Sequence, residues 1–120
     1  MIHLIEDETN MREMLDNSFI DPAHQIVEAH NMQQALSYLD EGEPDLMILN
    51  LRLPDLSAFE ILDHMDQMLP EYVNFPVVLI STMPVNNNLI MEQYPRVMKI
   101  FTKPFDRNEL LEFIQQTLNK

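Results

Sequence analysis

The sequence predicts one α/β domain over residues 1–120, built on a five-stranded parallel sheet with helices on both faces. Two observations carry this prediction. Segments typical of strands and of helices alternate five times along the chain, which indicates βαβ units and therefore parallel strands. Residues 46–49 and 76–80 are apolar at every position, as in strands that are buried on both faces of a sheet.

The first part of the chain predicts two short strands and two helices. A strand over residues 2–5 stops at an acidic stretch, and Thr9 or Asn10 then caps a helix that runs to about residue 19. A second strand follows over residues 25–29. Asn31 caps the second helix, whose inner side is formed by Met32, Ala35, Leu36 and Leu39.

The middle of the chain holds the strand around which the others are arranged. Residues 46–49 are followed by a polar residue, Asn50, and then by a turn that passes through Pro54. Ser57 and Glu60 have the spacing of a capping box, so a third helix begins there. Its apolar side is predicted to be Phe59, Leu62 and Met65.

The last part predicts two strands and two helices. The strand over 76–80 ends on Ser81 and Thr82. The fourth helix has the least regular pattern: Pro84 is expected in its first turn, but three consecutive asparagines compete with helical hydrogen bonds. A strand over 97–101 follows. Asp106 opens the final helix, whose apolar residues are Leu110, Leu111, Ile114 and Leu118.

Composition excludes several classes of protein. Seven Lys and Arg against 20 Asp and Glu give a net charge of -13, which argues against direct binding of nucleic acid. Without cysteine the chain has neither disulfides nor zinc–thiolate sites. No apolar run is long enough to cross a membrane and no signal peptide is evident, so we expect a cytoplasmic protein. The four histidines lack metal-ligand spacing and are expected at the surface: His3, His24, His30 and His64.

Polar residues follow four of the five predicted strands. Parallel strands bring their carboxyl ends to one edge of the sheet, where ligands of such folds bind. Carboxylates and an amide oxygen suit a hard cation such as Mg2+, and a lysine with a hydroxyl suits a phosphoryl group. Two structural explanations stay open. The acids could stabilise a helix N-terminus and pair with the lysine, and the serine hydroxyl could be hydrogen-bonded to a neighbouring strand. The residues concerned are Glu6, Asp7, Asn50, Ser81 and Lys103.

Four segments closely resemble the receiver domain of bacterial two-component response regulators: LIEDE (4–8), LNLRLPD (49–55), VVLIST (77–82) and TKPF (102–105). The resemblance spans essentially the whole chain and implies a CheY-like, flavodoxin-like doubly wound fold with strand order 2-1-3-4-5. It implies a weak Mg2+ site formed by Glu6, Asp7, Asn50 and the main-chain carbonyl of Arg52. It also implies that Ser81, Thr82 and Lys103 contact a phosphoryl group, and that the Lys103–Pro104 bond is cis.

The departures from the family pattern change the expected function. Asn50 stands where the family has its phosphoacceptor aspartate, and a carboxamide has no anionic oxygen to attack phosphorus. Ile100 stands at the aromatic switch position and has no hydroxyl to move. Thr82 replaces a small residue, while Ala58 and Arg96 occupy positions where glycine is frequent.

Three classes of function follow. The first is a pseudo-receiver that is not an enzyme and signals by protein contact; its fourth helix, fifth strand and last helix would bind a protein partner or a second copy, and a histidine kinase is a candidate partner. The second is a receiver modified at another acid, Asp55 or Asp7, or one whose acceptor was changed to Asn50 by engineering. The third, an enzyme or cofactor binder on this fold, lacks both an aspartyl nucleophile and a Ser/Thr/Gly-rich phosphate loop.

Overall fold

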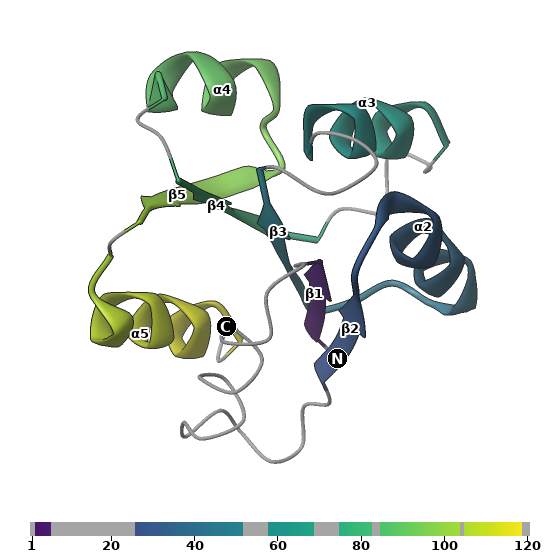
Figure 1. The fold of residues 1–120 in the computed structure, drawn as a ribbon, viewed down its shortest axis with the longest axis horizontal. Coiled ribbons are helices and arrows are strands. Elements are labelled where there is room, and N and C mark those ends of the chain that lie inside the picture. Colours follow the sequence, from purple (N-terminus) through teal and green to yellow (C-terminus); the bar gives the residue numbers. More distant parts are fainter. Residues whose placement is uncertain are drawn as a thin grey trace.

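Five parallel strands form the centre of the molecule in the order β2-β1-β3-β4-β5, which confirms the predicted sheet (Figure 1). The computed structural model describes residues 2–5, 26–51, 58–68, 75–82, 85–103 and 105–118. The helix predicted up to residue 19 lies outside these ranges. The strands are β1 (Ile2–Ile5), β2 (Ile26–Ala29), β3 (Leu46–Asn50), β4 (Val77–Ser81) and β5 (Val97–Thr102).

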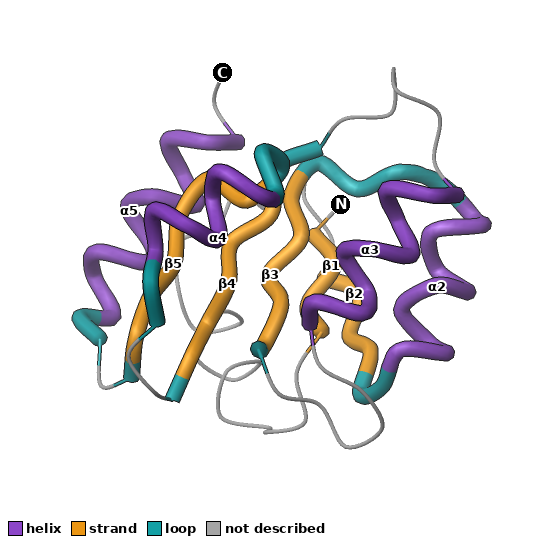
Figure 2. Tube along the Cα trace, turned by 90° about the horizontal axis from the view of Figure 1, so that it is seen from above, coloured by secondary structure: helices purple, strands orange, loops and turns teal. Residues whose placement is uncertain are grey.

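Helices cover both faces of this sheet, as Figure 2 shows from above. On one face lie α2 (Met32–Glu41), α3 (Ala58–Met68) and α4 (Asn87–Gln93), and on the other lies α5 (Arg107–Leu118). Among the helices of the described segments, none is long and apolar enough to cross a membrane.

Alternation along the strands divides the core into two clusters. In β3, Met47 and Leu49 pack with α2, α3 and α4, whereas Leu46 and Ile48 pack with α5. Every residue of β3 is buried, because helices cover the sheet on both sides. The unbroken apolar run of β3 is therefore explained, as predicted, by burial on both faces of the sheet.

Polar side chains begin three of the helices. The side chain of Asn31 accepts a hydrogen bond from the Gln34 N–H at 2.9 Å, and that of Asp106 accepts one from the Asn108 N–H at 2.8 Å, as expected for caps. In α4 the cap is Asn86, whose side chain accepts from the Leu89 N–H at 3.1 Å. The helix begins directly after this asparagine. Pro84, which was predicted in the first turn of this helix, lies outside the described residues.

Strand β5 contains an irregularity that the sequence pattern did not predict. Val77 pairs with Val97 but Val78 pairs with Lys99, so the register skips Met98. Met98 is 49% exposed, one of two large apolar side chains that the described residues leave in solvent. The extra residue also brings both Val97 and Ile100 onto the face that packs against α4.

His3 is buried, which contradicts the expectation that the histidines lie at the surface. Its side chain is 1% exposed within β1, and its ring lies 6.2 Å from that of Tyr38 on α2. Neither ring nitrogen has a hydrogen-bond partner in the described part of the chain. Since every residue of β1 is buried, this position faces the core whatever its polarity. His30 is exposed, as expected.

Burial lowers the pKa of His3 below its ordinary value of 6.5, because a charged imidazolium in this core would lose its hydration. The unfolded chain therefore takes up a proton that the folded chain refuses as pH falls through 6.5. The contribution of the neutral His3 to the free energy of unfolding is fully present above that pH and is lost as pH falls below it. The free energy of unfolding then decreases by up to about 1.4 kcal/mol per pH unit.

We expect His3→Leu to remove this slope and to stabilise the fold near neutral pH by roughly 1–2 kcal/mol, because two unpaired buried nitrogens are replaced by apolar atoms. Urea unfolding measured between about pH 7.5 and about pH 5.5 checks both effects, above the range in which carboxylates dominate. His30→Gln is the control for loss of a surface histidine. Equal slopes for wild type and His3→Leu would contradict the account.

Candidate functional site

The carboxyl ends of three neighbouring strands meet at one edge of the sheet and bring three of the predicted site residues together. Asn50 is the last residue of β3 and pairs with Ile80, and the N–H of Leu51 donates to the carbonyl of Ile80 at 2.8 Å. Ser81 ends β4 one residue later. The N–H of Lys103, just after β5, donates to the carbonyl of Ser81 at 2.7 Å. Parallel register therefore places these residues as the sequence predicted.

Asn50 occupies the centre of this edge and is only 6% exposed. It continues the side of β3 that Leu46 and Ile48 present to α5, since alternate residues of a strand share a face. A neutral amide loses far less than a carboxylate when it is removed from water at such a position. The strand end is therefore suited to an uncharged side chain unless a cation lies beside it.

Ser81 and Lys103 differ in how they are placed. Ser81 is 1% exposed and lies within β4, while Thr82 follows the strand and is exposed. Lys103 is half-buried. A hydroxyl and an ammonium group thus belong to residues joined by a backbone hydrogen bond. Ser81 lies one strand away from Asn50, and Lys103 follows the strand after that. Such a pair could bind the oxygens of an anion.

Ile100, which was predicted to occupy the switch position, is 7% exposed and belongs to the core cluster beneath α4. It pairs with Leu79 on the neighbouring strand, and Ile90 of α4 belongs to the same cluster. A side chain packed in a dense core has no cavity beside it into which it could move. Ile100 therefore fills the core and carries no polar group toward the strand ends.

Several predicted site residues lie outside the described residues. This applies to Glu6, Asp7, Arg52 and Asp55, and to the peptide bond between Lys103 and Pro104. Of the predicted magnesium ligands only Asn50 has a described position, and it offers one neutral oxygen. Within the ranges given above, no three acidic or histidine side chains are grouped closely enough to hold a metal ion.

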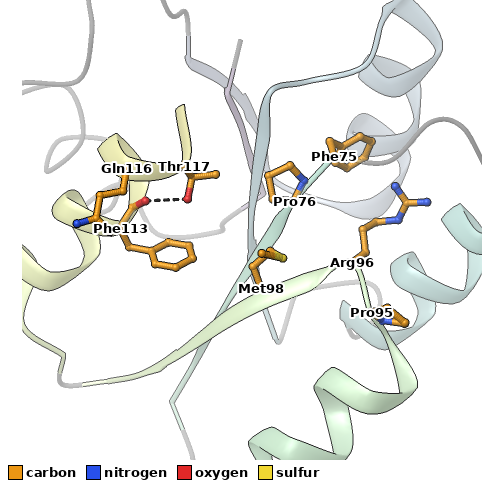
Figure 3. Close-up of a pocket in the computed structure, with 8 residues that line it drawn as sticks. All are labelled: Phe75, Pro76, Pro95, Arg96, Met98, Phe113, Gln116 and Thr117. Carbon is orange, nitrogen blue, oxygen red and sulfur yellow. Dashed lines mark hydrogen bonds between the residues drawn. The ribbon is translucent and has the colours of Figure 1, made fainter. Parts of the chain in front are cut away.

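A cavity of about 370 Å³ lies away from this edge, at the amino ends of β4 and β5 (Figure 3). Met98 and Phe113 form apolar walls, and the hydroxyl of Thr117 donates to the Phe113 carbonyl at 2.8 Å. Because it lies beside the residues that begin these strands, this cavity is separate from Asn50 and its neighbours. Its full lining is Phe75, Pro76, Pro95, Arg96, Met98, Phe113, Gln116 and Thr117.

One polar contact of the described core was not foreseen from the sequence. The hydroxyl of Tyr94, just after α4, donates to Oδ1 of Asp63 on α3 at 2.8 Å. These residues are 31 positions apart in the chain, so no local pattern joins them. The available signal was the spacing of Phe59, Asp63 and Asp66, which places three ring or acidic side chains on one stripe of α3.

Comparison with known proteins gives the same family as the motifs. Sporulation initiation phosphotransferase F of Bacillus subtilis is 28% identical over 118 residues, which are 98% of this chain and 92% of that protein. The phosphate regulon transcriptional regulatory protein PhoB of Pseudomonas aeruginosa is 26% identical over 121 residues, which are 99% of this chain and 52% of that protein. The chain thus spans about half the length of PhoB.

A solved structure has the same fold. The signal receiver domain of a LuxO repressor protein from Vibrio parahaemolyticus matches with a TM-score of 0.80 and 21% identity, over 98% of this chain and 88% of that one. The family model of the response regulator receiver domain matches residues 2–115. With the strand order, the strand-end residues and this match over nearly its whole length, the chain belongs to the receiver domains of two-component response regulators.

Proposed function

We propose that this receiver domain signals by protein contact and is not phosphorylated at residue 50. The observation that supports the proposal is the amide of Asn50, buried at the end of β3 where the family has an aspartate. Ser81 and Lys103 lie at the same edge of the sheet, so the proposed change concerns the acceptor and leaves unchanged the two residues that we propose would contact a phosphoryl group.

The chemistry of phosphoryl transfer gives the reason. The acceptor attacks phosphorus with an anionic carboxylate oxygen and becomes an acyl phosphate. The carboxamide of Asn50 carries no negative charge, and its nitrogen lone pair is delocalised into the carbonyl. The same deficiency excludes an aspartyl-phosphate enzyme mechanism at this residue, so we propose a signalling module without enzymatic activity.

We further propose that the domain binds Mg2+ only weakly. Its ligands would be Glu6, Asp7, the amide oxygen of Asn50 and the main-chain carbonyl of Arg52. Mg2+ is a hard cation that favours charged oxygens, and here one of the family's three carboxylates is a neutral amide. The ion would neutralise the two remaining acids.

The proposed output surface is formed by α4, β5 and α5, with a protein partner or a second copy of the chain as its ligand. Two features support this choice. Leu89 of α4 and Met98 of β5 are exposed by 59% and 49%. Ile100, in the core cluster that includes Ile90 of α4, offers no polar side chain that could report on the strand ends. We propose that this surface keeps one arrangement whatever the chemistry at residue 50, and that a histidine kinase remains a candidate partner.

The first test is direct modification. Incubated with Mg2+ and acetyl phosphate, the wild-type domain should gain no phosphoryl group at residue 50, because its amide is not a nucleophile. Intact-mass spectrometry with peptide mapping measures this. Asn50→Asp is the matched control and should become phosphorylated, since Ser81 and Lys103 are retained. Stoichiometric modification of wild type at residue 50 would refute the proposal.

The second test concerns charge and metal. A carboxylate added at residue 50 would be repelled by the two acids that we propose as Mg2+ ligands. Two charges about 4 Å apart at an effective dielectric of about 20 repel each other by up to about 4 kcal/mol, and the charge of Lys103 would reduce this value. We expect Asn50→Asp to lower the melting temperature without metal and to respond strongly to millimolar Mg2+. Wild type should respond weakly.

Asn87→Asp, which adds the same charge at an exposed position of α4, is the control for the net charge of the chain. It should behave like wild type in both conditions. A strong Mg2+ response of wild type, unchanged in Asn50→Asp, would show that the electrostatic explanation is wrong.

A further inference from the structure

Tyr94 connects three elements at the point where α4 ends. Its N–H donates to the carbonyl of Ile90 at 2.8 Å and closes the helix, and its carbonyl accepts from the N–H of Val97 at 2.9 Å, where β5 begins. Its hydroxyl donates to Asp63 on α3 at 2.8 Å. The side chain is 5% exposed. One residue therefore joins the end of α4 to both β5 and α3.

Two further contacts follow the same line along α3. The ring of Phe59 stacks on that of Tyr94, with centroids 5.9 Å apart and planes 22° apart. Asp66 lies 3.9 Å from Nε of Arg96, whose guanidinium sits 5.1 Å from the centre of the Phe75 ring. Phe59, Asp63 and Asp66 are spaced by one helical turn each, so one stripe of α3 faces residues 94–96.

The hydroxyl of Tyr94 is a hydrogen-bond donor over the whole physiological range. Burial raises the pKa of Tyr94 to about 12, and the hydrogen bond to Asp63 with the nearby charge of Asp66 adds to the effect. A neutral phenol that donates to a carboxylate makes a charge-assisted bond, which is stronger than a bond between neutral groups. Asp63 itself is exposed, so water weakens the bond, but the hydroxyl of Tyr94 remains the donor and the carboxylate of Asp63 the acceptor.

Helix α4 has few other attachments. It spans seven residues, and Ile90 is the buried one among them. The residues from Asn86 to Leu89, and also Glu92 and Gln93, are exposed. A helix of two turns is not stable by its own hydrogen bonds and depends on tertiary contacts. The contacts at its carboxyl end therefore matter for its position.

We propose that Tyr94 is a positioning residue: its hydrogen bond to Asp63 holds α4 against α3 and so determines the arrangement of the output surface. The inference rests on the proposed function, in which α4 contributes to that surface, and adds what regulates it. A partner that binds α4 better with this bond broken would shift the domain toward an arrangement in which α4 is released from α3, without any change at residue 50. Tyr94 and Asp63, and not Asn50, then set the state that a partner meets.

Amide hydrogen exchange of the intact chain, without phosphoryl donor or added Mg2+, tests this. Tyr94→Phe keeps the ring and removes the hydroxyl, so it should accelerate exchange of the α4 amides by about tenfold while β3 amides change little. Asp63→Ala should have the same effect, and Asp63→Asn, which keeps an acceptor oxygen, a smaller one. Tyr38→Phe on α2 is the matched control and should leave α4 unchanged.

Unchanged exchange of α4 in Tyr94→Phe would overturn the inference. Equal acceleration in α4 and β3 would also overturn it, because Tyr94 would then support the whole fold and not the position of one helix. An effect of Tyr94→Phe that Asp63→Ala does not reproduce would exclude the hydrogen bond as its cause. Since Asn50 is intact throughout, none of these results bears on whether residue 50 accepts phosphate.

Discussion

Burial of β3 on both faces is the constraint on which the rest of the structure depends. A strand in this position must be apolar along its length, and it needs paired strands on both sides and helices above and below. β1 and β4 supply the pairing, while α2, α3 and α5 supply the cover. The one polar residue of β3, Asn50, comes last, at the carboxyl edge of the sheet, and is itself buried. Because its amide is neutral, it loses less than a carboxylate would when it is removed from water.

Much of the fold could be predicted because its signals are local. Unbroken apolar runs identify buried strands, and Asn31 and Asp106 cap helices by contacts within one turn. The strand-end residues followed from parallel topology, which brings Asn50, Ser81 and Lys103 to one edge whatever their separation in sequence. Which way each side chain points follows from alternation within the strand and was not specified by the motifs.

The remaining features depend on contacts distant in sequence. His3 interrupts an aliphatic strand, and its burial follows from the cover over β1 and not from its own polarity. Met98 is exposed because the register of β5 shifts there, which no turn signal marks. The three asparagines at the start of α4 suggested a poorly formed helix, yet Asn86 caps it and the other two form its first residues. The bond between Tyr94 and Asp63 joins the residue after α4 to a residue of α3 that is 31 positions away in the chain, so no local pattern predicts it.

These features support the proposal of a receiver in which the strand ends and the surface of α4 are not coupled. At the strand ends, Asn50 lacks the charge on which phosphoryl transfer depends. Under α4, Ile100 fills the core with aliphatic atoms, and Tyr94 ties the helix to α3. Coupling between two sites requires an element with two arrangements that both sites bias. In the proposed function neither Ile100 nor the amide of Asn50 provides one, and we therefore expect a surface that binds its partner without phosphorylation.

The most direct measurement is the backbone amide spectrum of Asn50→Asp with Mg2+, recorded with and without beryllofluoride as the phosphoryl analogue. Our account predicts shifts confined to the strand ends, around residues 50, 81 and 103. The amides of α4, the first part of β5 and α5 should stay in place. Large shifts spread over residues 85–118 would contradict it. They would mean that the switch is intact in this fold and that Asn50 alone keeps it silent.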